Sequence, residues 1–181
     1  MDLEYQLIRD NLNEMLIDRG YKKLNEEIKE AEEAKLDVEK YKKLDGRDIV
    51  VIYVIMEEKL GVEFIKMIIQ TFIDLEIDHL IIISRDKLTP FAKKYIISES
   101  MKIELFLFEE LKFNITKHEL VPKHVLLSNK ESQEVIEYYG KKYLPQIKKS
   151  DIVSRYFDAE LGQIFRIYRN EGGIYYRLVV N

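Results

Sequence analysis

Apolar positions in the first quarter of the chain repeat with a helical period. Between residues 8 and 16 they recur at the i, i+4, i+7 and i+8 spacing of one helix face. This spacing predicts a first helix that ends at Gly20. A second helix is predicted from about Asn25 to Leu36, and the charged run 26–43 is interpreted as a solvated helix face.

The pattern changes at residues 49–55, which form a continuous, mostly β-branched run typical of a strand buried on both faces. The following apolar positions predict a helix over 64–75, a strand over 79–84, a helix over 89–97 and a strand over 103–108. Because parallel neighbours need crossover connections, this alternation predicts a three-layer α/β domain with a mainly parallel sheet.

A second, smaller domain is predicted after Asn114, where a proline and shorter elements replace the alternation. We place the boundary between residues 1–113 and 114–181. Residues 1–114 contain 18 Lys/Arg and 25 Asp/Glu, a net charge of -7, whereas residues 115–181 contain 11 and 8, a net charge of +3. Two interpretations remain open: a C-terminal part that meets an acidic partner or nucleic acid, or an ordinary solvated surface.

Helix-capping and turn signals divide the second domain. Ser128 and Glu131 have the spacing of a capping box, which predicts a helix to about Tyr139, before Gly140. Further predicted elements are an extended piece from Leu144-Pro145, a short helix from Ser150 or Asp151 to Phe157, and two strands at 163–169 and 174–180 that flank a glycine-containing turn.

Composition narrows the function. The chain is 46% apolar and has no cysteine, so it can bury a core but cannot form disulfides or thiolate sites. Its longest apolar run, 49–56, is far shorter than the roughly 20 residues that span a bilayer. Because its first residues also lack the features of a secretory signal, we expect a soluble, intracellular protein without membrane contact or cofactor.

The chain lacks the common motifs of phosphate loops, nucleophile elbows and zinc proteases. His118 and His124 lie six residues apart, which fits neither helical chelation nor a zinc finger, so we expect backbone-satisfied histidines and no metal site. Asp48 before one strand and Glu57-Glu58-Lys59 after it leave one catalytic alternative, a stand-alone metal-dependent nuclease built on the N-terminal sheet.

A basic stretch surrounds the predicted start of the helix at 89–97. Thr89 and Pro90 are ordinary helix-start residues, but a helix N-terminus after a parallel strand can also bind a phosphate backbone without reading any base. The candidate nucleic-acid-proximal residues are Arg85, Lys87, Thr89, Pro90, Lys93 and Lys94. A plain solvated helix start, or a free nucleic-acid-binding adaptor with a continuous basic face, remain the alternatives.

The run from Asn114 to His124, Asn-Ile-Thr-Lys-His-Glu-Leu-Val-Pro-Lys-His, resembles the junction between the two domains of the common jaw subunit of eukaryotic RNA polymerases I, II and III. Archaeal RNA polymerases contain a small subunit that is similar to the C-terminal domain of that family. The resemblance continues in the family's order through Leu144-Pro145, Arg155-Tyr156-Phe157, Gly162-Gln163 and Tyr176-Arg177-Leu178-Val179, and more thinly in Asp18-Arg19-Gly20-Tyr21 and Leu88-Thr89-Pro90-Phe91-Ala92-Lys93.

The resemblance implies a non-catalytic structural subunit of a DNA-directed RNA polymerase. Residues 1–113 would form the lower jaw domain beside downstream double-stranded DNA, with a restriction-endonuclease-like topology and weak backbone contacts. Residues 114–181 would form an assembly domain that packs onto the largest polymerase subunit. The residues carried over as partner-docking are Glu119, Leu120, Val121, Pro122, Lys123, His124, Pro145, Gln163 and Arg177. The expected location is the nucleus, or a viral transcription compartment if the source is a virus.

Overall fold

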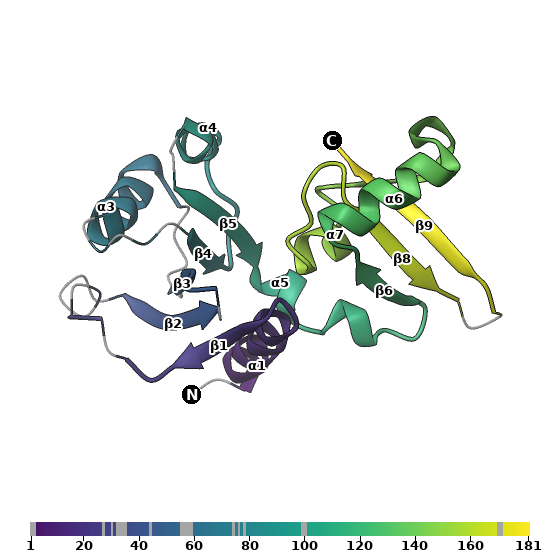
Figure 1. Ribbon diagram of the computed structural model, residues 1–181. Helices are drawn as coiled ribbons and strands as arrows, with labels where there is room; N and C mark the ends of the chain where they lie inside the picture. Colours follow the sequence, from purple (N-terminus) through teal and green to yellow (C-terminus); the bar gives the residue numbers. More distant parts are fainter. Residues whose placement is uncertain are drawn as a thin grey trace. The chain divides into compact units, whose positions relative to one another are not determined.

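The computed structural model describes residues 3–26, 28–29, 31, 36–43, 45–54, 60–73, 75, 77, 79–98, 101–169 and 172–181. The chain divides into two compact units, Met1–Phe113 and Asn114–Asn181 (Figure 1). Both units contain helices and a sheet, so the predicted α/β class is confirmed. Within the described ranges, no helix combines the length and the hydrophobicity that crossing a bilayer would require.

The N-terminal unit contains a five-stranded sheet with the order β1-β2-β3-β4-β5. β3 pairs with β4 and β4 with β5 in parallel, whereas β1 pairs with β2 and β2 with β3 antiparallel. The predicted mainly parallel sheet is therefore wrong, because the sheet is mixed. Its strands are β1 (Tyr21–Leu24), β2 (Asp37–Lys43), β3 (Asp48–Val54), β4 (His79–Ser84) and β5 (Lys102–Leu107).

The error arose in the charged run 26–43, whose last seven residues form β2 and not a solvated helix face. Glu39 is a buried residue of β2. An apolar residue at this position would have shown the alternating apolar and polar pattern of a strand, whereas a charged residue hides it. The Glu39 carboxylate accepts hydrogen bonds from Arg9 Nη1 at 2.8 Å, from Lys23 Nζ at 2.6 Å and from the Tyr41 hydroxyl at 2.9 Å. Half of the predicted helix at 25–36 lies outside the described residues.

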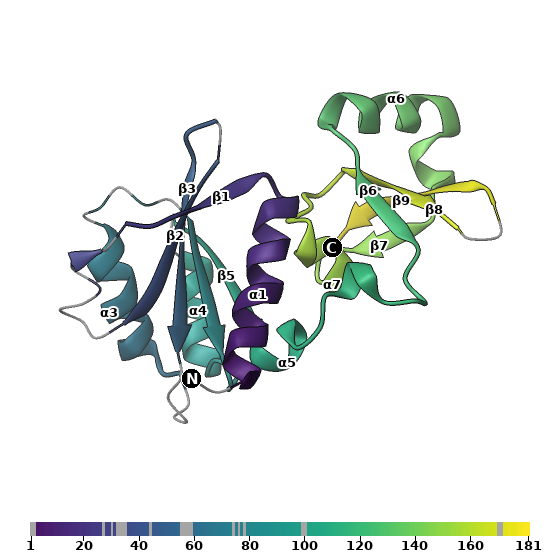
Figure 2. The same ribbon diagram turned by 90° about the horizontal axis from the view of Figure 1, so that it is seen from below.

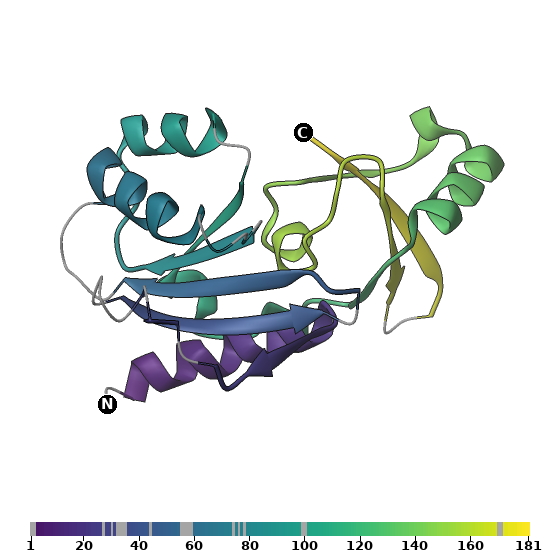
Figure 3. The same cartoon turned by 60° about the vertical axis from the view of Figure 1, so that its left-hand side comes forward.

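Helices cover both faces of the N-terminal sheet. In Figure 3, α1 lies on one side of the strands, and α3 and α4 lie on the other. The predicted helices and strands after residue 60 are confirmed within two residues at each end. The helices of this unit within the described residues include α1 (Leu3–Asp18), α3 (Val62–Ile73), α4 (Pro90–Ser98) and the unpredicted α5 (Phe108–Leu111).

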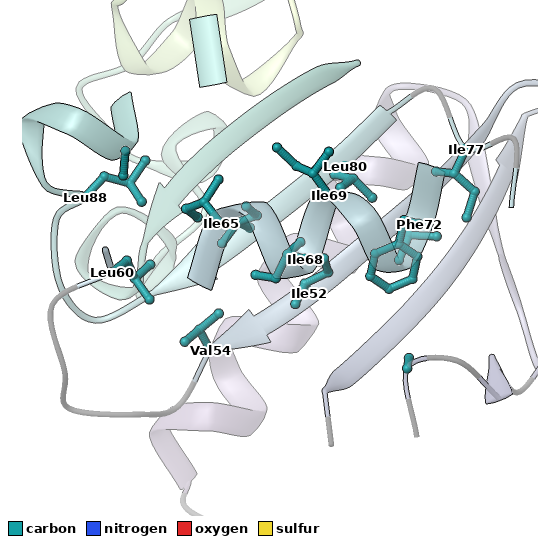
Figure 4. Close-up of a cluster of buried hydrophobic side chains, with 14 of the residues drawn as sticks. Ile52, Val54, Leu60, Ile65, Ile68, Ile69, Phe72, Ile77, Leu80 and Leu88 are labelled. Atoms are coloured by element: carbon teal, nitrogen blue, oxygen red, sulfur yellow. The ribbon is translucent and has the colours of Figure 1, made fainter. Parts of the chain in front are cut away.

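The core beneath α3 explains why the alternation of strands and helices was readable. Buried Ile52 and Leu80, from the two central strands, belong to one cluster with Ile65, Ile68 and Phe72 of α3 (Figure 4). Residues 65, 68 and 72 follow the helical i, i+3, i+7 spacing, so a single face of α3 supplies them all.

The C-terminal unit is built on a four-stranded mixed sheet with the order β6-β8-β9-β7. α6 and α7 lie on opposite sides of this sheet (Figure 2). The elements are η1 (Ile115–Lys117), β6 (Lys123–Leu126), α6 (Asn129–Tyr139), η2 (Lys141–Tyr143), β7 (Gln146–Lys148), α7 (Ile152–Tyr156), β8 (Ile164–Tyr168) and β9 (Ile174–Val180).

The predicted capping box and short helix of this unit are confirmed. Ser128 Oγ accepts from the Glu131 backbone N–H at 3.3 Å, and the Glu131 side chain accepts from the Ser128 N–H at 2.9 Å. Asp151 caps α7 by accepting from the Val153 N–H at 2.9 Å. The short strand β6 was not predicted from the sequence.

Candidate docking groove in the C-terminal unit

Polar side chains fold the recognisable run after residue 113 into a defined loop. The Asn114 side-chain oxygen accepts hydrogen bonds from the Thr116 backbone N–H at 2.9 Å and from the Thr116 hydroxyl at 2.7 Å, which starts η1. Its amide nitrogen donates to the hydroxyl of Tyr156 in α7 at 3.1 Å. These bonds fix the path of the chain from η1 into β6.

The β8–β9 hairpin carries a row of side chains on the sheet face that α7 partly covers. Ile167 lies opposite Tyr175 and Phe165 lies opposite Arg177, and directly paired residues of antiparallel strands point to the same side. His124 of β6 lies opposite Ile167 and joins the row. The α7 end of this face is filled by the core around Phe165.

Beyond that core, the same face opens into a groove of about 540 Å³. Its wall and floor combine apolar, cationic and acidic groups. The lining residues are Glu119, Leu120, Pro122, His124, Pro145, Ile167, Arg169, Tyr175, Tyr176 and Arg177. Leu120 is 83% exposed and Tyr175 is 46% exposed, so large apolar surface faces solvent here. Such surface beside fixed charges is typical of a protein-binding site.

The position of the histidine in this groove is set by two contacts. His124 Nδ1 lies 2.6 Å from the Pro122 carbonyl oxygen, and its ring packs edge-on against Phe165 with centroids 5.7 Å apart. Burial lowers the pKa of His124, and the nearby positive charge of Arg177 lowers it further, against the opposing effects of the Pro122 hydrogen bond and Asp151. The imidazole is therefore neutral at physiological pH and serves as part of the groove wall.

Six of the nine predicted partner-docking residues line this groove: Glu119, Leu120, Pro122, His124, Pro145 and Arg177. The other three lie elsewhere. Val121 packs against the core on the α7 side, and Lys123 is an exposed residue at the start of β6. The Gln163 side chain accepts from the Glu160 N–H at 2.7 Å and holds the turn before β8.

Sequence reasoning missed the hairpin's contribution of Ile167, Arg169, Tyr175 and Tyr176. A signal for three of them was present. In a hairpin of two strands, positions 167, 169, 175 and 177 alternate onto one face. The selection of Arg177 could therefore have identified the other three as residues of the same face. The guanidinium of Arg169 lies 4.4 Å from the centroid of the Tyr175 ring, which orients both groups at the groove edge.

The candidate nucleic-acid-proximal residues around the start of α4 differ in their surroundings. Thr89 Oγ1 accepts from the Ala92 N–H at 3.3 Å and starts the helix beside Pro90, while Lys87, Lys93 and Lys94 are exposed. Arg85 instead lies 3.6 Å from the Glu4 carboxylate and 5.3 Å from the centroid of the Phe108 ring. The lysines, more than Arg85, are therefore available to an anionic ligand.

The residues considered for catalysis are engaged in ion pairs where the structure describes them. Asp48 lies 3.3 Å from Lys40 Nζ and 3.6 Å from Lys42 Nζ, whereas residues 57–59 lie outside the described residues. In the described part of the chain, His, Asp and Glu side chains form no group of three or more that could hold a metal ion.

His118 has a structural role like that of His124. Its Nδ1 accepts a hydrogen bond from the Leu120 backbone N–H at 3.2 Å, which confirms the prediction that these two histidines are satisfied by the backbone.

Comparison with known proteins places this unit in a family. The family model of the C-terminal domain of RNA polymerase Rpb5 matches residues 113–179. The subunit RPABC1 of DNA-directed RNA polymerases I, II and III from Caenorhabditis elegans is 38% identical over 144 residues, which cover 75% of this chain and 68% of that protein. This chain belongs to the RPABC1 family.

Other relatives extend the similarity over most of the chain. The corresponding subunit from Dictyostelium discoideum is 37% identical over 134 residues, 71% of this chain and 68% of that protein. Subunit 5A of DNA-directed RNA polymerase V from Arabidopsis thaliana is 30% identical over 183 residues, 92% of this chain and 82% of that protein. RPABC1-type similarity thus includes the N-terminal unit, where the resemblance in sequence motifs was thin.

Proposed function

We propose that this chain is a non-catalytic structural subunit of a nuclear-type DNA-directed RNA polymerase, in which the C-terminal unit docks on the largest subunit through the groove. The observation that carries the proposal is the coincidence of two independent features. The residues that resemble the family's domain junction line the same cavity as exposed apolar and cationic residues of the β8–β9 hairpin.

The physical character of the groove supports docking of a protein. Protein interfaces are enriched in aromatic residues and arginine, and their binding energy concentrates in a few such residues. Tyr175, Arg169 and Arg177 are of these types and lie together at one cavity. Leu120 and Tyr175 are exposed apolar groups of the same lining, and a partner would bury them.

The N-terminal unit would supply the jaw beside downstream double-stranded DNA. Support comes from Lys87, Lys93 and Lys94, which are exposed around the N-terminus of α4. A few lysines can neutralise only a few phosphates, and residues 1–114 carry a net charge of -7. DNA contact in this role is therefore weak, directed at the backbone and sensitive to salt. We also propose that the N-terminal unit has a restriction-endonuclease-like topology.

Affinity purification of the tagged full-length chain tests this function. The wild-type protein should bring down the two largest polymerase subunits at a salt concentration that leaves the polymerase intact. The double variant Leu120→Asp, Tyr175→Asp places charges in the groove and should lose most of that capture. Tyr138→Asp is the matched control, because Tyr138 is 82% exposed on α6 and lies outside the groove.

The two possible failures test different parts of the proposal, namely membership in a polymerase and docking through the groove. If the wild-type chain captures no polymerase subunit, it is not a stable polymerase subunit. If the groove variant captures as much as wild type, the chain docks through another surface.

A further inference from the structure

The cations of the groove have no acidic counterpart within the described residues. Arg177 and Arg169 form no ion pair there, although Arg169 stacks on Tyr175. The one carboxylate of the lining, Glu119, belongs to the exposed loop before β6. Arginine presents a planar fork of donors that matches a carboxylate in bidentate geometry. The groove is therefore electrostatically complementary to an anionic group.

Apolar surface lies next to these two arginines. Ile167 and Tyr175 are paired across the hairpin, and Leu120 and Pro122 line the groove from the loop before β6. A ligand that is only a charge would leave this surface in water. A ligand that carries an apolar or aromatic side chain beside its anionic group would satisfy both parts of the lining.

The size of the groove limits the shape of the ligand. About 540 Å³ accommodates a few side chains. A whole helix would need a channel about 10 Å wide along its length. An extended peptide, whose side chains alternate between two sides, can place one carboxylate toward the arginines and direct a neighbouring side chain into the apolar part.

We propose that the groove binds an extended acidic segment of the largest polymerase subunit, in which an Asp or Glu pairs with Arg177 and Arg169 and a nearby apolar side chain packs on Ile167 and Tyr175. This inference rests on the proposed function and specifies the chemistry of the partner. The apolar lining favours one discrete carboxylate beside an apolar side chain over the continuous phosphates of a nucleic acid, which would leave Leu120 exposed.

A photo-crosslinking experiment on the full-length, polymerase-assembled chain tests the inference. A benzophenone-bearing amino acid replaces Tyr175, the complex is purified through a tag on this chain, and the irradiated product is identified by mass spectrometry. The expected product joins position 175 to a segment of the largest subunit that has an Asp or Glu within a few residues of the crosslink.

A matched pair of charge reversals isolates the ion pair. Arg177→Glu should reduce the yield of this crosslink by a factor on the order of ten or more, because one side of a close charge pair becomes repulsive. Lys148→Glu makes the same change of net charge on an exposed residue of β7 outside the groove and should leave the yield unchanged. An unchanged thermal unfolding midpoint for Arg177→Glu shows that the unit remains folded.

Three results would overturn the inference while the proposed function stands, provided that wild type still co-purifies with the polymerase. They are a crosslinked segment without a carboxylate, a crosslink to nucleic acid, and full crosslinking by Arg177→Glu. If Arg177→Glu unfolds, Arg177→Gln serves in its place, and undiminished crosslinking by that variant also overturns the inference. Failure of wild type to co-purify at all would instead refute the proposed function.

Discussion

Glu104 is the centre of a buried ion-pair network in the N-terminal unit, and we predict that Glu104→Gln strongly destabilises this unit. The two carboxylate oxygens accept from Arg19 Nη1 and Nη2 at 2.8 and 2.9 Å, and His79 Nε2 lies 2.7 Å from Oε1. The Arg19 side chain is 3% exposed and that of Glu104 is 15% exposed. Glutamine would keep the shape but remove the negative charge with which the buried Arg19 guanidinium pairs at this position.

The expected loss follows from two estimates. Removing one partner of a buried pair typically costs about 3–5 kcal/mol. Burial alone would raise the pKa of Glu104, but the His79 hydrogen bond and the Arg19 charge outweigh it and lower the pKa from 4.5 to about 2. At about 1.4 kcal/mol for each pKa unit, this difference corresponds to roughly 3 kcal/mol. Both values are a large share of the roughly 5–15 kcal/mol that stabilises a typical domain.

The pH dependence has a definite sign. Because the pKa is lower in the folded state, the contribution of Glu104 is fully present above the unfolded-state pKa of 4.5 and is lost as the pH falls toward about 2. Wild type should therefore lose stability through this window, and Glu104→Gln should lack that component.

Urea unfolding at pH 7, followed by far-ultraviolet circular dichroism, measures the change in the free energy of unfolding. Glu109→Gln is the control, because Glu109 is 72% exposed in its ion pair with Lys112 and should contribute less than about 1 kcal/mol. If Glu104→Gln costs no more than this control, the network does not stabilise the fold and the reasoning is refuted.

Three further predictions concern the C-terminal core, a helix cap and DNA contact. Phe165→Ala removes a fully buried ring and should cost about 3–5 kcal/mol in urea unfolding, and a cost below about 1 kcal/mol would contradict its place in the core. Ser128→Ala removes the α6 capping box and should cost about 1 kcal/mol, measured in the same way, with an unchanged free energy as the refuting result. Binding of double-stranded DNA by the full chain should weaken steeply with salt, and Lys93→Gln should reduce the slope of log affinity against log salt by about 1, whereas a salt-independent affinity would rule out a backbone contact.

The parts of the fold that the sequence predicted are those in which local pattern and tertiary environment agree. β3 and β4 are buried on both faces, so their continuous apolar runs could not be mistaken for a solvated segment. The start of α6 was equally readable, because Ser128 and Glu131 satisfy backbone donors within a single turn.

β1 and β2 could not be predicted because distant partners determine their structure. Glu39 has a charge that normally marks a solvated position, and its burial depends on ion pairs with Arg9 of α1 and Lys23 of β1. Local propensity therefore favoured a helix, whereas pairing with β3 imposed a strand.

The groove could be predicted only in part, because strand pairing brings some of its residues together. Glu119 to His124 form a contiguous run in the sequence, so the resemblance identified them together. Arg169 and Tyr175 join them only because β8 and β9 pair as an antiparallel hairpin. The alternation within each strand could be read from the sequence, but which residues of the two strands lie opposite one another depends on the register of the pairing.

An electron cryomicroscopy structure of the polymerase purified through a tag on this chain tests the central claim most directly. We expect density for both units, with the groove between the η1–β6 loop and the β8–β9 hairpin covered by an extended segment of the largest subunit. A complex in which this groove is open to solvent, and the chain is held by other surfaces, would contradict the account.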